Sequence, residues 1–184
     1  MLKNDKIIII IFVENRRKSK MSLKKEIRLK IKSIRYEVEA SLFSGDDSDE
    51  ALTLRAEDAD DSPEVIEINS LGTLYDDGDR VEVTYEETEA TGMEGSVTTV
   101  SFLRSQSGIV SMTRSGAVST VLTFEAGKRY HCVYKTPYMP FEICVRTLKV
   151  ENLLMTMGTL DIDYVIEIRG ARAERTKFRM QILK

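Results

Sequence analysis

The stretch LDIDYVIEI at residues 160–168 decides the class of fold. Every second residue is apolar, from Leu160 to Ile168, and most of the residues between them are acidic. Successive side chains of a β-strand point to opposite faces, so a period of two predicts a strand with one buried face and one wet face. The stretch therefore predicts a sheet that must bury one apolar side.

The same alternation extends over most of the chain from Met21 onward. Turn sequences rich in Gly, Asp, Pro and Ser separate the alternating runs, and Asp76-Asp77-Gly78-Asp79 is typical of a β-hairpin. Near Ser33 the apolar phase slips by one residue, which predicts a β-bulge and places Tyr36 on the inner face. We expect about ten strands, over residues 27–39, 65–75, 81–87, 97–103, 109–114, 118–124, 129–136, 141–150, 160–168 and 176–183.

Short strands that follow one another through hairpins favour an up-and-down sandwich or barrel. A sheet with a single apolar face buries that face, and also removes its exposed edges, by curling on itself. We therefore predict an all-β protein, an antiparallel up-and-down meander closed into a barrel of about eight to ten strands. The single barrel domain spans residues 21–184 and contains an acidic loop insertion at residues 44–64.

The formal net charge of −3 for 184 residues hides an uneven distribution. Residues 1–35 hold twelve Lys and Arg against three acids, residues 36–92 hold two against nineteen, and residues 93–184 hold thirteen against eight. Basic and acidic blocks of one chain attract each other, and the basic side chains of the first strand alternate onto its outer face. We therefore expect no binding of nucleic acid, although the basic start is the segment that would provide it.

Residues 1–20 contain the only long apolar run, the seven residues from Ile7 to Val13. A membrane-spanning helix needs about twenty apolar residues, and the charged residues that follow do not form a secretory cleavage site. We expect a dispensable N-terminal segment, with a tail or a docking arm as alternatives, and a cytoplasmic protein that does not enter the membrane. Two cysteines, Cys132 and Cys144, agree with reduced thiols in that compartment.

The run YHCVYKTPY at residues 130–138, followed by a strand from Phe141, resembles the YwiB-like family, an uncharacterised bacterial family with a domain of unknown function numbered 1934. Similar stretches are residues 66–87, 110–116 and 124–127, so the likeness covers most of residues 65–182. The chain departs from the family at Met139, where glycine is usual. The resemblance implies a calycin-like, or lipocalin-like, barrel, and it implies no activity.

Arg114 is the leading candidate for a functional residue. If Val110 and Met112 point into the barrel, alternation sends Arg114 inward too, and a buried guanidinium must be paired because it keeps its proton. It would anchor a carboxylate or phosphate of a ligand through bidentate hydrogen bonds, or it would cap one barrel end against carbonyls or an aromatic ring. The other candidate ligand-binding residues fall on inward rows and would line a pocket or simply pack the core. They are Met112, Tyr85, Tyr130, Tyr134 and Tyr164.

We predict no catalytic residue, metal site or cofactor. His131 is the only histidine, and alternation places it on the outer face of its strand, away from the candidate residues. Cys132 and Cys144 are expected on different faces, with Cys132 opposite Ile143 or Val145. The acidic residues lack the spacing of an EF-hand.

The sequence thus favours a non-catalytic binder of a small or amphipathic ligand inside the barrel. The alternative is a filled barrel that acts as a protein-interaction or assembly module, and a third possibility is an enzyme with a site near Arg114 and Tyr134. A connected, polar-lined cavity of at least ~300 Å³ would favour binding, and an occluded interior would favour the interaction module. The identity of the ligand and the oligomeric state stay open.

Overall fold

The structure is a computed structural model that describes residues 22–38, 62–168 and 173–183. The expected dispensable segment, residues 1–20, and most of the expected acidic insertion, residues 44–61, lie outside the described residues. Among the described residues there is no helix long and apolar enough to cross a membrane.

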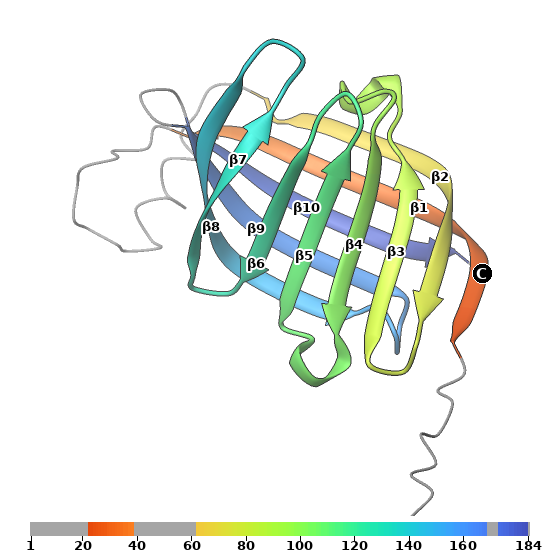
Figure 1. Ribbon diagram of the computed structural model, residues 1–184. Coiled ribbons are helices and arrows are strands. Elements are labelled where there is room, and N and C mark those ends of the chain that lie inside the picture. The colour runs from red at the N-terminus through yellow and green to blue at the C-terminus, as the bar shows by residue number, and fades with distance from the viewer. Residues whose placement is uncertain (1–21, 39–61, 169–172, 184) are drawn as a thin grey trace, which may run out of the picture.

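Ten antiparallel strands make up most of the described chain, with two short 3₁₀ helices between them (Figure 1). Each expected strand is present, because each has one buried face and one solvent-exposed face. The elements are β1 (Leu23–Val38), β2 (Glu64–Asp76), β3 (Arg80–Glu86), η1 (Glu89–Thr91), β4 (Val97–Leu103), η2 (Arg104–Gln106), β5 (Ile109–Ser115), β6 (Thr120–Glu125), β7 (Arg129–Lys135), β8 (Pro140–Leu153), β9 (Thr159–Ile168) and β10 (Ala173–Leu183).

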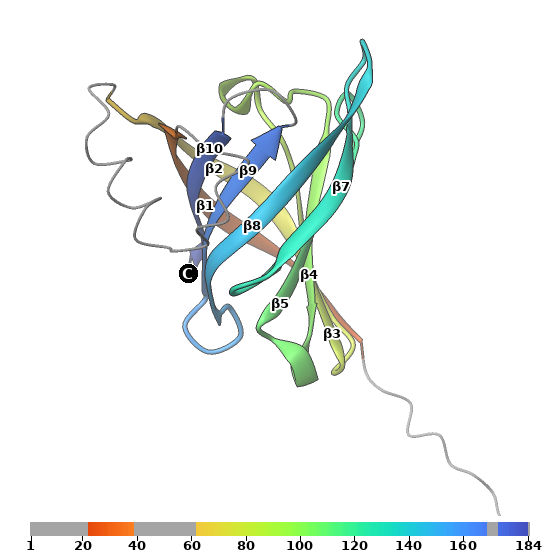
Figure 2. The same ribbon diagram turned by 90° about the vertical axis from the view of Figure 1, so that its left-hand side faces the viewer.

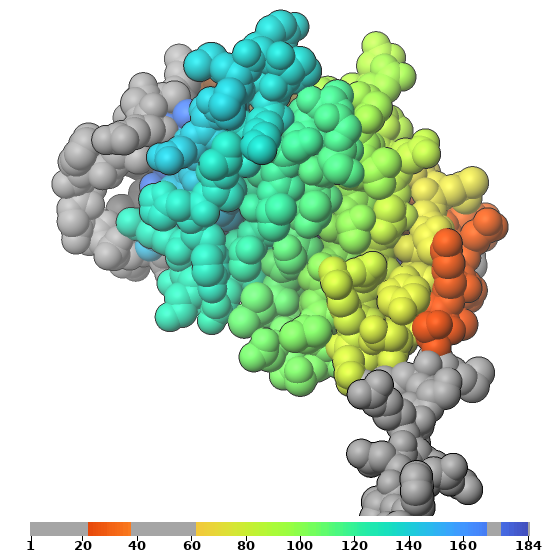
Figure 3. All heavy atoms as spheres, in the orientation of Figure 1, coloured from red at the N-terminus to blue at the C-terminus, as the bar shows by residue number. Residues whose placement is uncertain are grey.

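The strands form one sheet in the order β6-β5-β4-β3-β2-β1-β10-β9-β8-β7. Neighbours in the sheet are neighbours in the chain except for β1 and β10, which pair the first described strand with the last. The sheet curls into a nearly closed barrel, with the β7–β8 hairpin projecting beyond one end (Figure 2). In the space-filling view, β3 to β6 form a continuous wall (Figure 3). The predicted antiparallel up-and-down barrel is confirmed.

The barrel closes between β6 and β7 through a single β-bridge. Ser119 and Lys135 exchange two backbone hydrogen bonds, of 3.0 and 2.9 Å. No other backbone hydrogen bond links β6 to β7, both of which lie wholly within the described residues. We call this line of contact between residues 120–125 and 129–135 the β6–β7 seam.

Amides on the β6–β7 seam are expected to exchange with deuterium at least ~10-fold faster than their sequence neighbours. The bridge fixes which N–H groups face the seam, because successive N–H groups of a strand point to opposite sides. The seam-facing amides are those of Val121, Thr123, His131 and Val133. Those of Leu122 and Cys132 face β5 and β8 and serve as internal controls. Hydrogen exchange followed by NMR tests this, and equal protection of both sets would show that the seam is hydrogen-bonded.

The interior of the barrel has an apolar half and a polar half. The inward-facing residues change from apolar to polar toward the barrel end at which the odd-numbered strands finish. On β3, buried Val81 and Val83 are followed by Tyr85, and on β5, buried Met112 is followed by Arg114. The apolar half is built of buried side chains that form one cluster. The largest fully buried ones are Phe124, Leu29, Met112, Leu122, Leu160, Ile162 and Met180.

The predicted β-bulge near Ser33 is wrong. Strand β1 pairs with β2 and with β10 without any shift of register. Ser33 and Arg35 therefore continue the inward row, and Tyr36 faces outward, where Lys177 Nζ lies 5.4 Å from its ring centroid. The apolar residues of β1 change to the outer face after Ser33 because the inner face becomes polar at this end of the barrel. No extra residue is inserted into the strand.

A register shift does occur in β8, between Thr147 and Lys149. Before it, Cys132 of β7 lies opposite Ile143 of β8, one of the two expected partners. Cys132 packs against the core, whereas Cys144 follows the buried Ile143 and so belongs to the outer face. The prediction that the two cysteines lie on different faces is confirmed, and both are free thiols.

Candidate ligand-binding cavity

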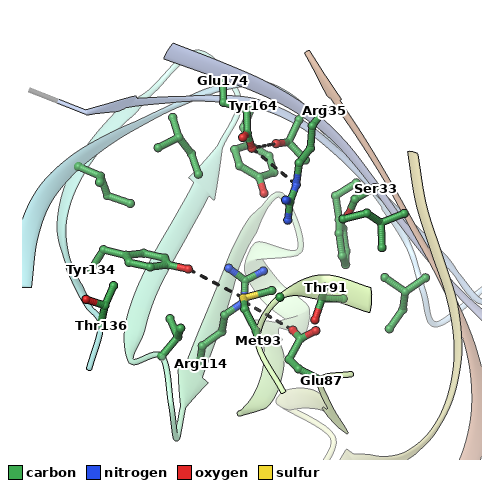
Figure 4. Close-up of a pocket in the computed structure, with 18 of the residues that line it drawn as sticks. Ser33, Arg35, Glu87, Thr91, Met93, Arg114, Tyr134, Thr136, Tyr164 and Glu174 are labelled. Atoms are coloured by element: carbon green, nitrogen blue, oxygen red, sulfur yellow. Dashed lines mark hydrogen bonds and ion pairs between the residues drawn. The ribbon is translucent and has the colours of Figure 1, made fainter. Parts of the chain in front are cut away.

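A cavity of about 410 Å³ occupies the polar half of the barrel. Its walls come from β1, β2, β3, β5 and β7 to β10, together with the segment around η1 (Figure 4). Much of the lining is aliphatic or aromatic and includes Ile31, Ile66, Met93, Val118, Phe141, Ile166 and Ile168. Charged and hydroxyl-bearing side chains complete it, which makes the cavity amphipathic.

Arg114 enters the cavity from the end of β5, and its side chain is only 11% exposed. Its Nε lies 3.6 Å from Glu87 Oε1 and, within the described residues, has no hydrogen-bond partner. Nη2 donates to the thioether of Met112 over 3.4 Å, and a thioether is a weak acceptor. A guanidinium has five N–H donors and keeps its charge in a protein. Arg114 is thus a buried cation with unused donor capacity.

Glu87 is the buried carboxylate that accompanies Arg114, with a side chain only 2% exposed. Its Oε1 accepts a hydrogen bond of 2.5 Å from the Thr98 hydroxyl. Burial raises the pKa of Tyr85, and the charge of Glu87 raises it further, so this phenol stays protonated at neutral pH. Sequence reasoning did not single out Glu87, although it continues the inward row that contains Tyr85.

Arg35 of β1 brings a second guanidinium into the cavity from the opposite wall (Figure 4). Its Nη1 donates to Glu64 Oε2 over 3.3 Å, and its Nε lies 3.7 Å from Glu174 Oε1. That Glu174 oxygen also accepts a 3.1 Å hydrogen bond from the Thr176 hydroxyl. Each arginine therefore lies beside a glutamate that accepts a hydrogen bond from a threonine, and the cluster with Arg35 is the more exposed.

Two further tyrosines reach the cavity from β7 and β9. The Tyr134 hydroxyl lies 3.9 Å from Met93 Sδ, and its ring packs on Phe141 with centroids 5.3 Å apart. Tyr164 is 4% exposed and packs on Phe124, with centroids 4.8 Å apart. Burial raises the pKa of Tyr164, so its hydroxyl is also a donor at neutral pH.

Of the six candidate ligand-binding residues, four line the cavity. They are Tyr85, Arg114, Tyr134 and Tyr164. Met112 is fully buried beneath Arg114 and does not reach the cavity wall. Tyr130 lies outside the cavity as well, because its hydroxyl donates to Glu125 over 2.5 Å.

His131 lies on the exposed outer face of β7, as expected from alternation. It is therefore not available to a reaction in the cavity. The described residues contain no group of three or more His, Cys, Asp or Glu side chains placed to hold a metal ion.

Comparison with known proteins bears on the fold and the family. The crystal structure of the ywiB protein from Bacillus subtilis superposes with a TM-score of 0.61 at 20% sequence identity, covering 88% of this chain and 94% of that chain. At this identity the likeness concerns the fold alone. No curated protein matches the chain. A family model described as a domain of unknown function, DUF1934, matches residues 52–180, well over half of the chain. The expected resemblance is confirmed, and the chain belongs to the DUF1934 family.

Proposed function

We propose that the barrel binds a small amphipathic ligand in its cavity, with a carboxylate or phosphate of the ligand on Arg114, and catalyses no reaction. The observation that carries the proposal is the buried guanidinium with spare donors beside a cavity of about 410 Å³. Charge-assisted, bidentate hydrogen bonds from arginine suit such an acidic group. The aliphatic walls suit the apolar part of the ligand.

The cavity favours this proposal over a filled barrel that acts only as an interaction module. Its volume exceeds the ~300 Å³ that separates the two hypotheses. An enzyme is less favoured because the lining within the described residues holds no histidine or cysteine, the side chains that most often serve as bases or nucleophiles. The free thiols support a reducing compartment such as the cytoplasm.

Calorimetric titration with decanoate and with octyl phosphate tests the proposal. The double variant Arg114→Met/Glu87→Gln removes both buried charges and keeps the side-chain volumes close to the originals. We expect it to bind either probe at least ~10-fold more weakly than the wild type, because the charge-assisted hydrogen bonds are lost. Its melting temperature should stay within about 6 °C of the wild type, since no unpaired charge is left behind.

A matched control is Arg179→Met, which removes an arginine from an ion pair on the outer face. Arg179 Nε lies 2.6 Å from Asp161 Oδ1, and neither residue lines the cavity. This variant should bind both probes as the wild type does. Unchanged affinity in the double variant, or no binding to the wild type, would contradict the proposed function.

A further inference from the structure

We infer that the ligand is a zwitterion that carries an ammonium group next to its acidic group, as an α-amino acid with an apolar side chain does. This inference rests on the proposed function and specifies the class of ligand. Its starting point is the charge of the cavity. Among the described lining residues, the arginines Arg35 and Arg114 are balanced by the glutamates Glu87 and Glu174, so the ionisable groups leave no net charge for a simple anion to neutralise.

The more buried ion pair, Arg114 with Glu87, decides which charged groups of a ligand the cavity prefers. Their side chains are 11% and 2% exposed, so water screens their charges poorly. Arg35 and Glu174 are 28% and 44% exposed, and solvent weakens their influence on a ligand. The charged end of the ligand therefore binds beside a buried cation and a buried anion, and both determine which charged groups it carries.

A simple anion bound to Arg114 would meet Glu87 as a like charge. Arg114 Nε is 3.6 Å from Glu87 Oε1, so an anion on the same guanidinium lies close to that carboxylate. Two carboxylates that share a site repel each other, and an uncompensated buried charge is costly. An ammonium beside the anion replaces this repulsion with a second attraction.

Glu87 has acceptor capacity for that ammonium. The contacts from Thr98 and from Arg114 both go to Oε1, and the Tyr85 phenol is a third neighbour of this carboxylate. A carboxylate offers about four lone-pair sites, so capacity for a further donor is left. Glu87 also lines the cavity, next to Arg114 (Figure 4). The ligand's two charged groups, one atom apart, thus have two facing partners of opposite sign.

The cavity limits the size of the apolar part. A volume of about 410 Å³ corresponds to about fourteen groups the size of a water molecule. An eight-carbon amino acid is within this limit, and α-aminooctanoate is the probe we choose. Octanoate, octylamine and N-acetyl-α-aminooctanoate share its chain and differ in their charged groups.

Titration calorimetry of these four probes against the wild type tests the inference without any variant. We expect α-aminooctanoate to bind at least ~10-fold more tightly than octanoate or its own N-acetyl derivative, because only the free ammonium pairs with Glu87. In Glu87→Gln, measured below its melting temperature with circular dichroism as a check on folding, the order should reverse. The zwitterion should lose at least ~10-fold in affinity, and octanoate should bind as tightly as to the wild type or more so.

The outcomes separate this inference from the proposed function. Equal or tighter binding of octanoate than of α-aminooctanoate by the wild type would overturn the zwitterion and leave the anion-binding barrel in place. Preference for octylamine over both would overturn the two together, because the site would then recognise a cation. Failure of all four probes to bind would also count against both.

Discussion

Replacing Glu87 by alanine is expected to lower the free energy of unfolding by about 3 to 5 kcal/mol. The change removes the one carboxylate that pairs with Arg114 among the described residues, and it leaves this guanidinium, 11% exposed, buried without that counter-ion. It also takes the acceptor away from Thr98, which donates to Glu87 over 2.5 Å. Denaturation by urea, monitored by circular dichroism, measures the loss.

The double variant Arg114→Met/Glu87→Gln should recover most of that loss and lie within about 1.5 kcal/mol of the wild type. Removing both charges of a buried pair is often neutral, whereas removing one is not. The exposed pair Arg179 and Asp161, with side chains 61% and 28% exposed, supplies a control. Asp161→Ala should cost less than about 1 kcal/mol. A comparably small cost for Glu87→Ala would mean that water reaches the more buried ion pair.

Gly116→Ala is expected to cost about 3 kcal/mol or more, because backbone strain and steric overlap act together. Gly116 lies in the turn between β5 and β6 with φ of 125°, and a Cβ there would approach Gly95 O to 2.3 Å and Ser96 Cα to 2.8 Å. Both contacts are backbone atoms, so no side chain can rotate away. The same turn holds Val118, whose N–H donates to Ser96 Oγ over 3.0 Å and whose side chain lines the cavity.

Gly108→Ala is the matched control in the preceding turn, between β4 and β5. A Cβ at Gly108 would meet no heavy atom within 4 Å, so the stability should change by less than about 0.5 kcal/mol. Thermal melting of the two variants side by side tests the contrast. Similar melting temperatures would show that the turn at Gly116 relaxes to admit a side chain.

Alternation was sufficient to predict the strands and the inward direction of Arg114. It works because every strand has a dry and a wet face, so parity alone assigns a side chain to one of them. The same rule would have located Glu87, which extends the inward row of β3 beyond Tyr85. It failed at Ser33 because an apolar residue was assumed to mark the inner face, and this end of the barrel has a polar interior.

Other features of the site depend on contacts between strands that one sequence does not specify. Arg114 meets Glu87 only because β4 lies between their strands and the turn after β3 brings the carboxylate back over Thr98. Tyr130 was expected in the cavity from its parity, but its position along β7 carries its hydroxyl to Glu125. Parity assigns a face, whereas the distance along the barrel axis decides whether that face is packed or hollow.

The pairing of β1 with β10 has a consequence for the order in which the protein folds during synthesis. Strands β1 to β6 form hairpins with their chain neighbours, so that half can assemble as it leaves the ribosome. One edge of β1 nevertheless remains unpaired until residues 173–183 emerge, since these supply its second partner. Closing so long a stretch of chain is entropically costly and slow. A nascent chain stalled before β10 should therefore expose unpaired backbone N–H and C=O groups along one edge of β1, to which chaperones or other chains can bind.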